Sequence, residues 1–205
     1  MKRYLALVLA LVIIGGLQAQ PIELPAPHKT GGMPLMEALA RRSTSHEFGA
    51  RELSVQQLAD LCWAGFGMNR PNGKRTAPSA SNSQENEIYL LLKKGAYVYD
   101  AAAHRLQPVA AEDLRTLVRG GEKAPLVIVY IADLSKRDSG SPESRKKVAC
   151  IDSAFISENI YLYCASEGLL TGYRGGFDEK ALTAKLDLRA TQAVIAVQPV
   201  GYPAP

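Results

Sequence analysis

The chain has 205 residues, a formal net charge of +4 at pH 7, and 47% hydrophobic residues. This length and composition predict one globular domain with a substantial core, and no second domain is needed. Two of the positive charges, Lys2 and Arg3, lie at the extreme N-terminus, and no stripe of basic residues with interleaved aromatics follows them. Nucleic-acid binding is therefore not expected.

The first twenty residues have the order of an export signal. A positive end (residues 1–3) is followed by an apolar core (residues 5–14) and a small-residue exit (residues 15–20). The apolar core is shorter than the ~20 residues that cross a bilayer, so stable membrane insertion is not expected. We predict a signal peptide at residues 1–19, cleaved after Ala19, and a mature protein that is exported to the periplasm or secreted. The alternatives are an uncleaved anchor and a buried helix.

A proline-rich lead and a helix come next. Residues 20–34 predict an extended tether outside the core, because proline is frequent in them. From Leu35, apolar residues recur at helical spacing, and the basic pair Arg41-Arg42 stands at the end of this first helix. The globular domain is therefore placed at residues 35–205.

A capped helix and a long loop follow. Ser54, with Gln57 three residues later, has the spacing of a capping box, so a second helix is predicted to begin there and to end near Gly67. Residues 69–84 are polar and rich in Gly, Pro and Ser. Long loops inside a compact domain usually carry function, and we expect this loop to do so.

The second half of the domain alternates strands with helices. Short apolar runs separated by turns, at residues 88–92, 96–99 and 105–106, predict antiparallel strands. The β-branched run at residues 126–131 predicts a buried central strand, and a last strand is expected at residues 193–197. The predicted fold is α+β, with a central, mainly antiparallel sheet flanked by helices.

The longest predicted helix runs from Ser141 to Glu167. Apolar residues lie on two of its sides, with Val148, Ile151, Phe155 and Leu162 on one and Ile156, Ile160 and Tyr163 on the other. A helix that is apolar over so much of its circumference must be buried almost all round. In a domain of this size a second subunit is the natural cover for part of it, so we expect a dimer-forming helix.

The cysteines and histidines suggest no metal site. Cys62, Cys150 and Cys164 are an odd number, so at most one disulfide can form within the chain. We expect all three to be small buried core residues, with their disulfide state left open. No cysteine or histidine spacing is typical of zinc.

Three stretches offer hydrogen-bond donors, whereas no motif supplies a nucleophile or a P-loop. Arg41-Arg42-Ser43 presents two guanidinium groups and a hydroxyl, which suit a phosphate or a carbonyl oxygen. Residues 78–84 gather hydroxyls and amides in one loop, and Gly175-Gly176 leaves backbone N–H groups accessible to a flat ligand. For Arg41-Arg42-Ser43 the alternative is a pair of exposed surface charges. For residues 78–84 it is a turn that bonds to itself, and for Gly175-Gly176 it is an ordinary turn.

Taken in order, these stretches resemble the FMN-dependent nitroreductase family. The matching segments are Arg41 to Thr44 with Phe48 (R-R/H-S-x and an aromatic), residues 78–84 (P-S-x-x-N-x-Q), Asp152 to Thr171 (the long helix and G-L-G-T), residues 175–178, and residues 200–203. The resemblance covers nearly the whole chain from Leu35 to Pro203.

The resemblance implies a homodimer with FMN at the subunit boundary, which passes two electrons to or from a small organic substrate in a ping-pong cycle. The implied FMN contacts are Arg41, Arg42 and Ser43 for the phosphate and the pyrimidine side of the ring, Ser79, Ala80 and Asn82 from the other subunit, and Gly175 and Gly176 at the N5 and O4 edge. The flavin carries the chemistry, so no catalytic side chain is nominated.

The chain departs from the family pattern near the phosphate. His46 stands where a basic residue is frequent, and no Lys or Arg follows Pro203, so phosphate binding rests on Arg41 and Arg42, with Lys74 or Arg75 as further candidates. Two alternatives stay open: an FMN oxidase or dehydrogenase of a small ring, and a flavin-binding module without turnover. The electron donor, NAD(P)H or another, also stays open, because pyridine nucleotides are scarce outside the inner membrane.

Overall fold

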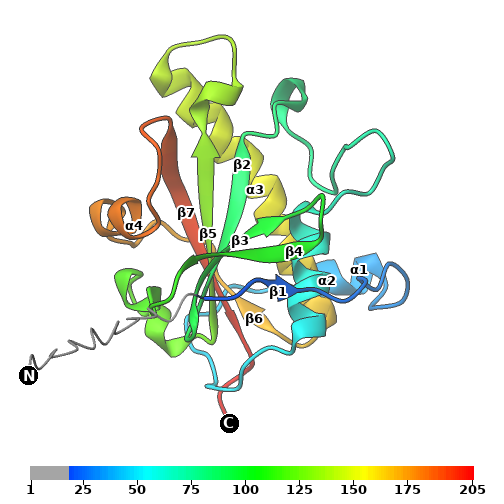
Figure 1. Cartoon of the computed structure of the whole chain (residues 1–205). Coiled ribbons are helices and arrows are strands. Elements are labelled where there is room, and N and C mark those ends of the chain that lie inside the picture. The colour runs from blue at the N-terminus through cyan, green and yellow to red at the C-terminus, as the bar shows by residue number, and fades with distance from the viewer. Residues whose placement is uncertain (1–18) are drawn as a thin grey trace, which may run out of the picture.

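The computed structural model of the protein describes residues 19–205 (Figure 1). The predicted signal peptide lies outside the described residues, except for its last residue, Ala19. Among residues 19–205, no helix combines the length and the apolar character that crossing a lipid bilayer requires.

One sheet of seven strands forms the centre of the molecule, in the order β1-β4-β3-β2-β5-β7-β6. The strands are β1 (Ile22–Glu23), β2 (Asn86–Leu92), β3 (Gly95–Asp100), β4 (Arg105–Ala110), β5 (Leu126–Asp133), β6 (Leu170–Thr171) and β7 (Gln192–Gly201). All of the pairings between these strands are antiparallel. The predicted α+β class, with its antiparallel sheet, is confirmed.

The sheet separates two hydrophobic cores, and its inner strand β5 contributes to both. Every residue of β5 is buried, as its β-branched sequence predicts. Ile128 and Tyr130 face one core, and Val127 and Val129 face the other, because successive side chains of a strand point to opposite sides.

Helices cover both sides of this sheet. They are α1 (Leu35–Arg41), α2 (Val55–Phe66), α3 (Pro142–Ser166) and α4 (Glu179–Lys185). Side chains of α2 and α3 complete the core of Ile128, and those of α4 complete the core of Val127. Figure 1 shows α2 and α3 together on one side of the sheet and α4 on the other. The predicted capping box at Ser54 and Gln57 is present at the start of α2.

Two residues of the proline-rich lead, Ile22 and Glu23, form an edge strand, although the lead was expected to be a tether outside the core. Ile22 pairs with Leu106 of β4, and its side chain packs against the core. The carbonyl oxygen of Pro25 lies 3.0 Å from Nε2 of His104. Composition alone did not predict this pairing, because proline is compatible with the outermost strand of a sheet, where one row of backbone groups needs no partner.

The three cysteines are all free thiols, and they differ in burial. Cys62 and Cys164 are buried, as expected, and burial raises the pKa of both thiols. Cys150 is exposed, which contradicts the expectation that all three are core residues. On α3 the neighbouring Ala149 takes the buried position of that turn, so Cys150 points outward.

Part of the apolar surface of α1 and α3 is exposed in the single chain. The exposed apolar side chains are Leu35, Met36 and Leu39 of α1, and Ile151 and Phe155 of α3. The prediction that α3 is buried almost all round is therefore not met by one chain. Exposed apolar side chains that gather on packed elements are typical of a protein–protein contact.

Candidate functional site

The segment after α1 lies against the segment after α3. Tyr161 of α3 joins them, because its hydroxyl lies 3.1 Å from Oγ1 of Thr44 and accepts a 2.8 Å hydrogen bond from the backbone N–H of Tyr173. The guanidinium carbon of Arg42 lies 5.3 Å from the centre of the Tyr161 ring, within the range of a cation–π contact. Two of the predicted donor-rich stretches are thus brought together by one aromatic side chain.

A cavity of about 260 Å³ lies beside this junction. Its lining includes Arg41, Ser43, Gly168, Thr171 and Pro203, so it contains two of the three residues predicted to hold a phosphate. Arg41 also forms an exposed ion pair with Glu37, one helical turn before it. A larger cavity of about 580 Å³, between the lead and helices α2 and α3, contains none of the predicted site residues.

The predicted loop at residues 78–84 is closed on itself. The N–H of Gln84 donates to Oγ of Ser79 over 3.0 Å, and the side-chain amide of Gln84 donates to Oδ1 of Asn82 over 3.2 Å. Ser81, Asn82 and Gln84 have positive φ angles. Three non-glycine residues in this region store backbone strain, which is typical of functional loops.

Side chains from outside the loop hold it in place. The backbone N–H of Ala80 donates to Oδ2 of Asp152 on α3 over 2.8 Å. Arg137 donates to the carbonyl oxygen of Ala80 over 3.2 Å and to Oγ of Ser83 over 3.0 Å. The predicted contact residue Ala80 therefore has its N–H group bonded within the chain.

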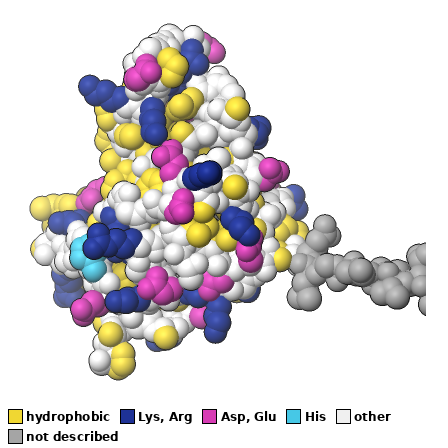
Figure 2. All heavy atoms as spheres, turned by 90° about the vertical axis from the view of Figure 1, so that its left-hand side faces the viewer, with side chains coloured by type: hydrophobic (Ala, Val, Ile, Leu, Met, Phe, Trp, Pro, Cys, Tyr) yellow, Lys and Arg dark blue, Asp and Glu magenta, His cyan; other side chains and the backbone are white. Residues whose placement is uncertain are grey.

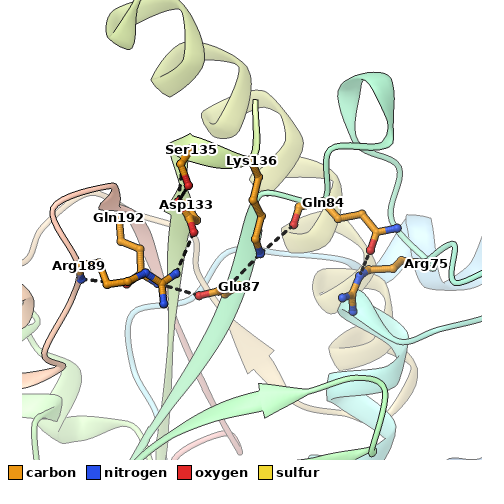
Figure 3. A network of polar contacts seen from close by, with 8 residues as sticks. All are labelled: Arg75, Gln84, Glu87, Asp133, Ser135, Lys136, Arg189 and Gln192. Carbon is orange, nitrogen blue, oxygen red and sulfur yellow. Dashed lines mark hydrogen bonds and ion pairs between the residues drawn. The ribbon is translucent and has the colours of Figure 1, made fainter. Parts of the chain in front are cut away.

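Arg75 and Lys136 anchor the end of the loop, as Figure 3 shows. Arg75 donates to the side chain of Gln84 over 2.8 Å and to the carbonyl oxygen of Phe66 over 3.0 Å. Lys136 forms an ion pair with Glu87 at 3.2 Å. Arg75 thus has a structural role, and its contacts do not place it with Arg41 at the predicted phosphate site.

Two buried carboxyl groups lie under the loop. Asp152 and Glu85 are both buried, and Arg137 lies 3.9 Å from Glu85. Burial raises the pKa of Asp152 from its ordinary value to about 6; the N–H of Ala80 opposes this rise and Glu85 adds to it. The sequence analysis identified Asp152 only as part of the long-helix motif, and it did not identify Glu85 or Arg137.

Gly175 and Gly176 follow a stretch that runs beside β7. Arg174 exchanges two backbone hydrogen bonds of 2.9 Å with Val197, which extends the pairing begun by β6. A Cβ atom added to Gly175 would meet nothing within 4 Å, whereas one added to Gly176 would meet the side chain of Arg119 at 3.5 Å. The backbone at Gly175 therefore has open space beside it.

The residues present fit an FMN molecule at this junction. The cavity with Arg41 and Ser43 can receive a phosphate, and the open backbone at Gly175 can receive the ring edge. Nε and Nη2 of Arg174 are buried without a hydrogen-bond partner among the described residues. Buried donors of this kind call for an acceptor from outside the chain.

The loop at residues 78–84, called the Ser79 loop from here on, does not contact the junction at Tyr161 within one chain. In the described part of the chain, no hydrogen bond or ion pair connects residues 79–82 with residues 41–46. Figure 1 shows the long loop after α2 near one end of β5, and α1 farther toward the other end. One chain therefore presents two separate sets of the predicted contacts.

Comparisons with known proteins agree with this fold. The family model described as "Nitroreductase family" matches residues 38–202. A protein of Methanocaldococcus jannaschii that carries a nitroreductase name is 22% identical over 180 residues, which cover 82% of this chain and 90% of the relative.

Among solved structures, one of Ralstonia eutropha, also described as a nitroreductase, has a TM-score of 0.85 and 34% identity over 93% of this chain and 92% of that one. A Staphylococcus epidermidis structure described as an NAD(P)H:FMN oxidoreductase has a TM-score of 0.65 at 13% identity, with 88% of this chain and 92% of that chain covered, a likeness of fold alone. The family match over most of the chain and the similarity to the Ralstonia structure lead to one conclusion: this chain belongs to the nitroreductase family of oxidoreductases.

Proposed function

We propose that this nitroreductase-family protein is an exported, FMN-dependent oxidoreductase that passes two electrons to or from a small organic substrate in a ping-pong cycle. The observation that carries the proposal is the junction at Tyr161, which brings the segment of Arg42 and Ser43 beside the segment of Gly175. These segments offer a cationic end and an open backbone end, which are the two requirements of a flavin mononucleotide.

The chain's own groups would bind and orient the cofactor. Arg41, Arg42 and Ser43 would hold its phosphate and the pyrimidine side of its ring, and the backbone N–H groups of Gly175 and Gly176 would donate to the N5 and O4 edge. Bound FMN supplies the hydride chemistry. Protons would come from water, so the chain needs no general base.

The absorbance spectrum of the purified protein tests this proposal. We expect bound flavin in the protein as isolated or after incubation with FMN. A protein that stays colourless after that incubation would contradict the proposal. Anaerobic titration with NADH and NADPH then identifies the donor.

Two alternatives give different results in the same experiment. An FMN oxidase or dehydrogenase of a small ring would be inert to both nucleotides and would show oxygen-dependent turnover. A binding module without turnover would hold flavin that no donor reduces at a useful rate.

Replacing Arg42 with alanine should weaken FMN binding about tenfold or more. Loss of a charge-assisted hydrogen bond to a phosphate or carbonyl oxygen costs about 1.5–3 kcal/mol, and 1.4 kcal/mol is a factor of about ten. Fluorescence titration of the apoprotein with FMN measures the effect. The matched control is Arg51→Ala, which removes another arginine stacked on a tyrosine, 4.1 Å from the ring of Tyr202, and should leave FMN affinity unchanged. Equal affinities of the two variants would remove Arg42 from the site.

We further propose that the protein is a homodimer. The exposed apolar side chains of α1 and α3 are suited to a second copy of the chain. In such a dimer, Ser79, Ala80 and Asn82 of one subunit would complete the flavin site of the other, which accounts for their separation from Arg42 within one chain.

Export is also a proposal, supported by the order of charged, apolar and small residues at the N-terminus. Cleavage after Ala19 would leave β1 intact, because that strand starts at Ile22. Mass spectrometry of the protein recovered from the periplasm or the medium tests it. A chain found only in the cytoplasm with residues 1–19 attached would contradict export.

A further inference from the structure

The lead is held against the domain close to the point where the proposed signal peptide would be cut. β1 is the outermost strand on its side of the sheet, and it pairs with β4 from Ile22 onward (Figure 1). Further along the lead, the backbone N–H of His28 donates to Oδ1 of Asp60 on α2 over 2.7 Å. A cut after Ala19 would therefore leave an end of only two residues before the first strand.

Gln20 would be the first residue after that cut, and its side chain is accessible. Gln20 and Pro21 are both exposed. Gln20 forms no hydrogen bond, through its backbone or its side chain, with another residue of the described range 19–205. A residue before a proline is kept out of the helical conformation, and no helix or turn covers Gln20. Its amide group is therefore free to react.

An N-terminal glutamine can close a five-membered ring on itself. The α-amine nitrogen attacks Cδ of the side chain, so the N–Cδ bond forms and the Cδ–Nε2 bond breaks. The amine gives one proton to the departing amide nitrogen, which leaves as ammonia. An α-amino group is much less basic than a lysine side chain, so part of it is uncharged and nucleophilic near neutral pH. Nothing is oxidised or reduced, and no co-reactant is needed.

The surface beside Gln20 favours an uncharged terminus. A cavity of about 390 Å³ is lined by Ala19, Gln20 and Pro21 and by residues 108–111 at the end of β4, and none of these side chains is charged. After the cut, the wall formed by residues 108–111 remains. A charge near an apolar wall loses part of its hydration, and no carboxylate in this lining would compensate an ammonium group. A lactam is neutral and avoids that cost.

We propose that Gln20 is a modification site: after residues 1–19 are removed, it closes to a pyroglutamyl residue that gives the protein a neutral, blocked N-terminus. The inference rests on the proposed export with cleavage after Ala19. Proteolysis concentrates at chain ends, and aminopeptidases bind a free α-amino group. Trimming from this end would soon reach Ile22 and the pairing of β1 with β4, so the lactam protects the edge of the sheet.

The N-terminal peptide of the exported protein tests the inference. The full chain, with residues 1–19, is expressed, and the protein is recovered from the periplasm or the medium. Its free amines are methylated at once, before digestion and mass spectrometry. We expect the peptide that starts at Gln20 to be unlabelled at its terminus and lighter than the unmodified sequence by one molecule of ammonia. A labelled Gln20, or a lactam that forms only during storage, would overturn the inference.

Gln20→Asn is the matched control. The asparagine side chain is one methylene shorter, so closure on its own amine would need a strained four-membered ring. The other cyclisation of asparagine uses the N–H of the next residue, which Pro21 lacks. The terminus of this variant should therefore be labelled and keep its full mass. An unlabelled terminus in the variant would show that the block does not depend on the glutamine side chain, which also contradicts the inference.

The first residue of the recovered protein separates this inference from the proposed export. A protein that retains residues 1–19 overturns the export and the lactam together. A protein that is cut but starts at another residue, or at Gln20 with a free amine, overturns the lactam alone.

Discussion

Replacing Phe155 with glutamate is expected to convert the proposed dimer into monomers and to abolish flavin binding. Phe155 is 46% exposed on α3 in the single chain, so a charge there is compatible with the folded monomer. In a dimer the same side chain would be covered, and an unpaired carboxylate would then have to be buried at a cost of several kcal/mol. Because the Ser79 loop would come from the partner, the monomer would hold only half of the FMN contacts.

Light scattering after size exclusion gives the mass, and the flavin-to-protein absorbance ratio gives the occupancy. Val55→Glu is the matched control: Val55 is an apolar residue of α2 with a similar exposed fraction, 43%, and its replacement should change neither quantity. A Phe155→Glu protein that remains dimeric would contradict the proposed interface. A monomer that still binds FMN with wild-type affinity would show that the site is complete in one chain.

Replacing Arg137 with methionine should destabilise the protein by about 3 kcal/mol at pH 7.5. Arg137 is the cation beside the buried carboxyl groups of Glu85 and Asp152, and it also holds the Ser79 loop by two hydrogen bonds. Removing one partner of a buried ion pair typically costs about 3–5 kcal/mol. Denaturant unfolding of the apoprotein measures the change in the free energy of unfolding.

The loss of stability caused by Arg137→Met should be smaller at pH 5 than at pH 7.5. The pKa of Asp152 is about 6 in the folded chain, above its ordinary value of 3.8, so Asp152 contributes stability below pH 4 that is lost as the pH rises through 6. The difference between these two pKa values corresponds to at most about 3 kcal/mol of folding free energy. Screening by nearby water reduces this contribution to about 1–2 kcal/mol. Arg137 favours the ionised form of Asp152, so its removal matters most where that carboxyl group is ionised.

Lys136→Met is the control for this prediction. Lys136 comes from the same turn, and its ion pair with Glu87 is partly exposed (Figure 3). Surface ion pairs contribute about 0–1 kcal/mol, so this variant should lose little stability at either pH. If Arg137→Met loses no more than Lys136→Met, or loses the same amount at pH 5 and pH 7.5, Arg137 does not stabilise the buried carboxylates.

The surface charge pattern agrees with the composition. Figure 2 shows Lys and Arg interspersed with Asp and Glu over the face of the molecule that it presents. On that face no large area of one sign appears. The face shown therefore offers no basic stripe of the kind that binds nucleic acid.

The candidate site could be found only in part from sequence. Arg42, Ser43 and Gly175 were identified because they stand in short motifs, and the structure brings their segments together at Tyr161. The cluster of Glu85, Arg137 and Asp152 was missed, because its members come from three segments and no spacing along the chain links them. Arg174 was also missed, since nothing in the sequence distinguishes it from an exposed arginine before a turn.

The sequence by itself determined the elements whose causes are local. The capping box at Ser54 and the buried run of β5 depend on residues a few positions apart, and both are present. Only the tertiary structure decided the pairing of β1 with β4, the exposure of Cys150, and the burial of Asp152. The physical reason is that burial and partner choice depend on contacts between residues far apart in the chain, which periodicity and propensity do not encode.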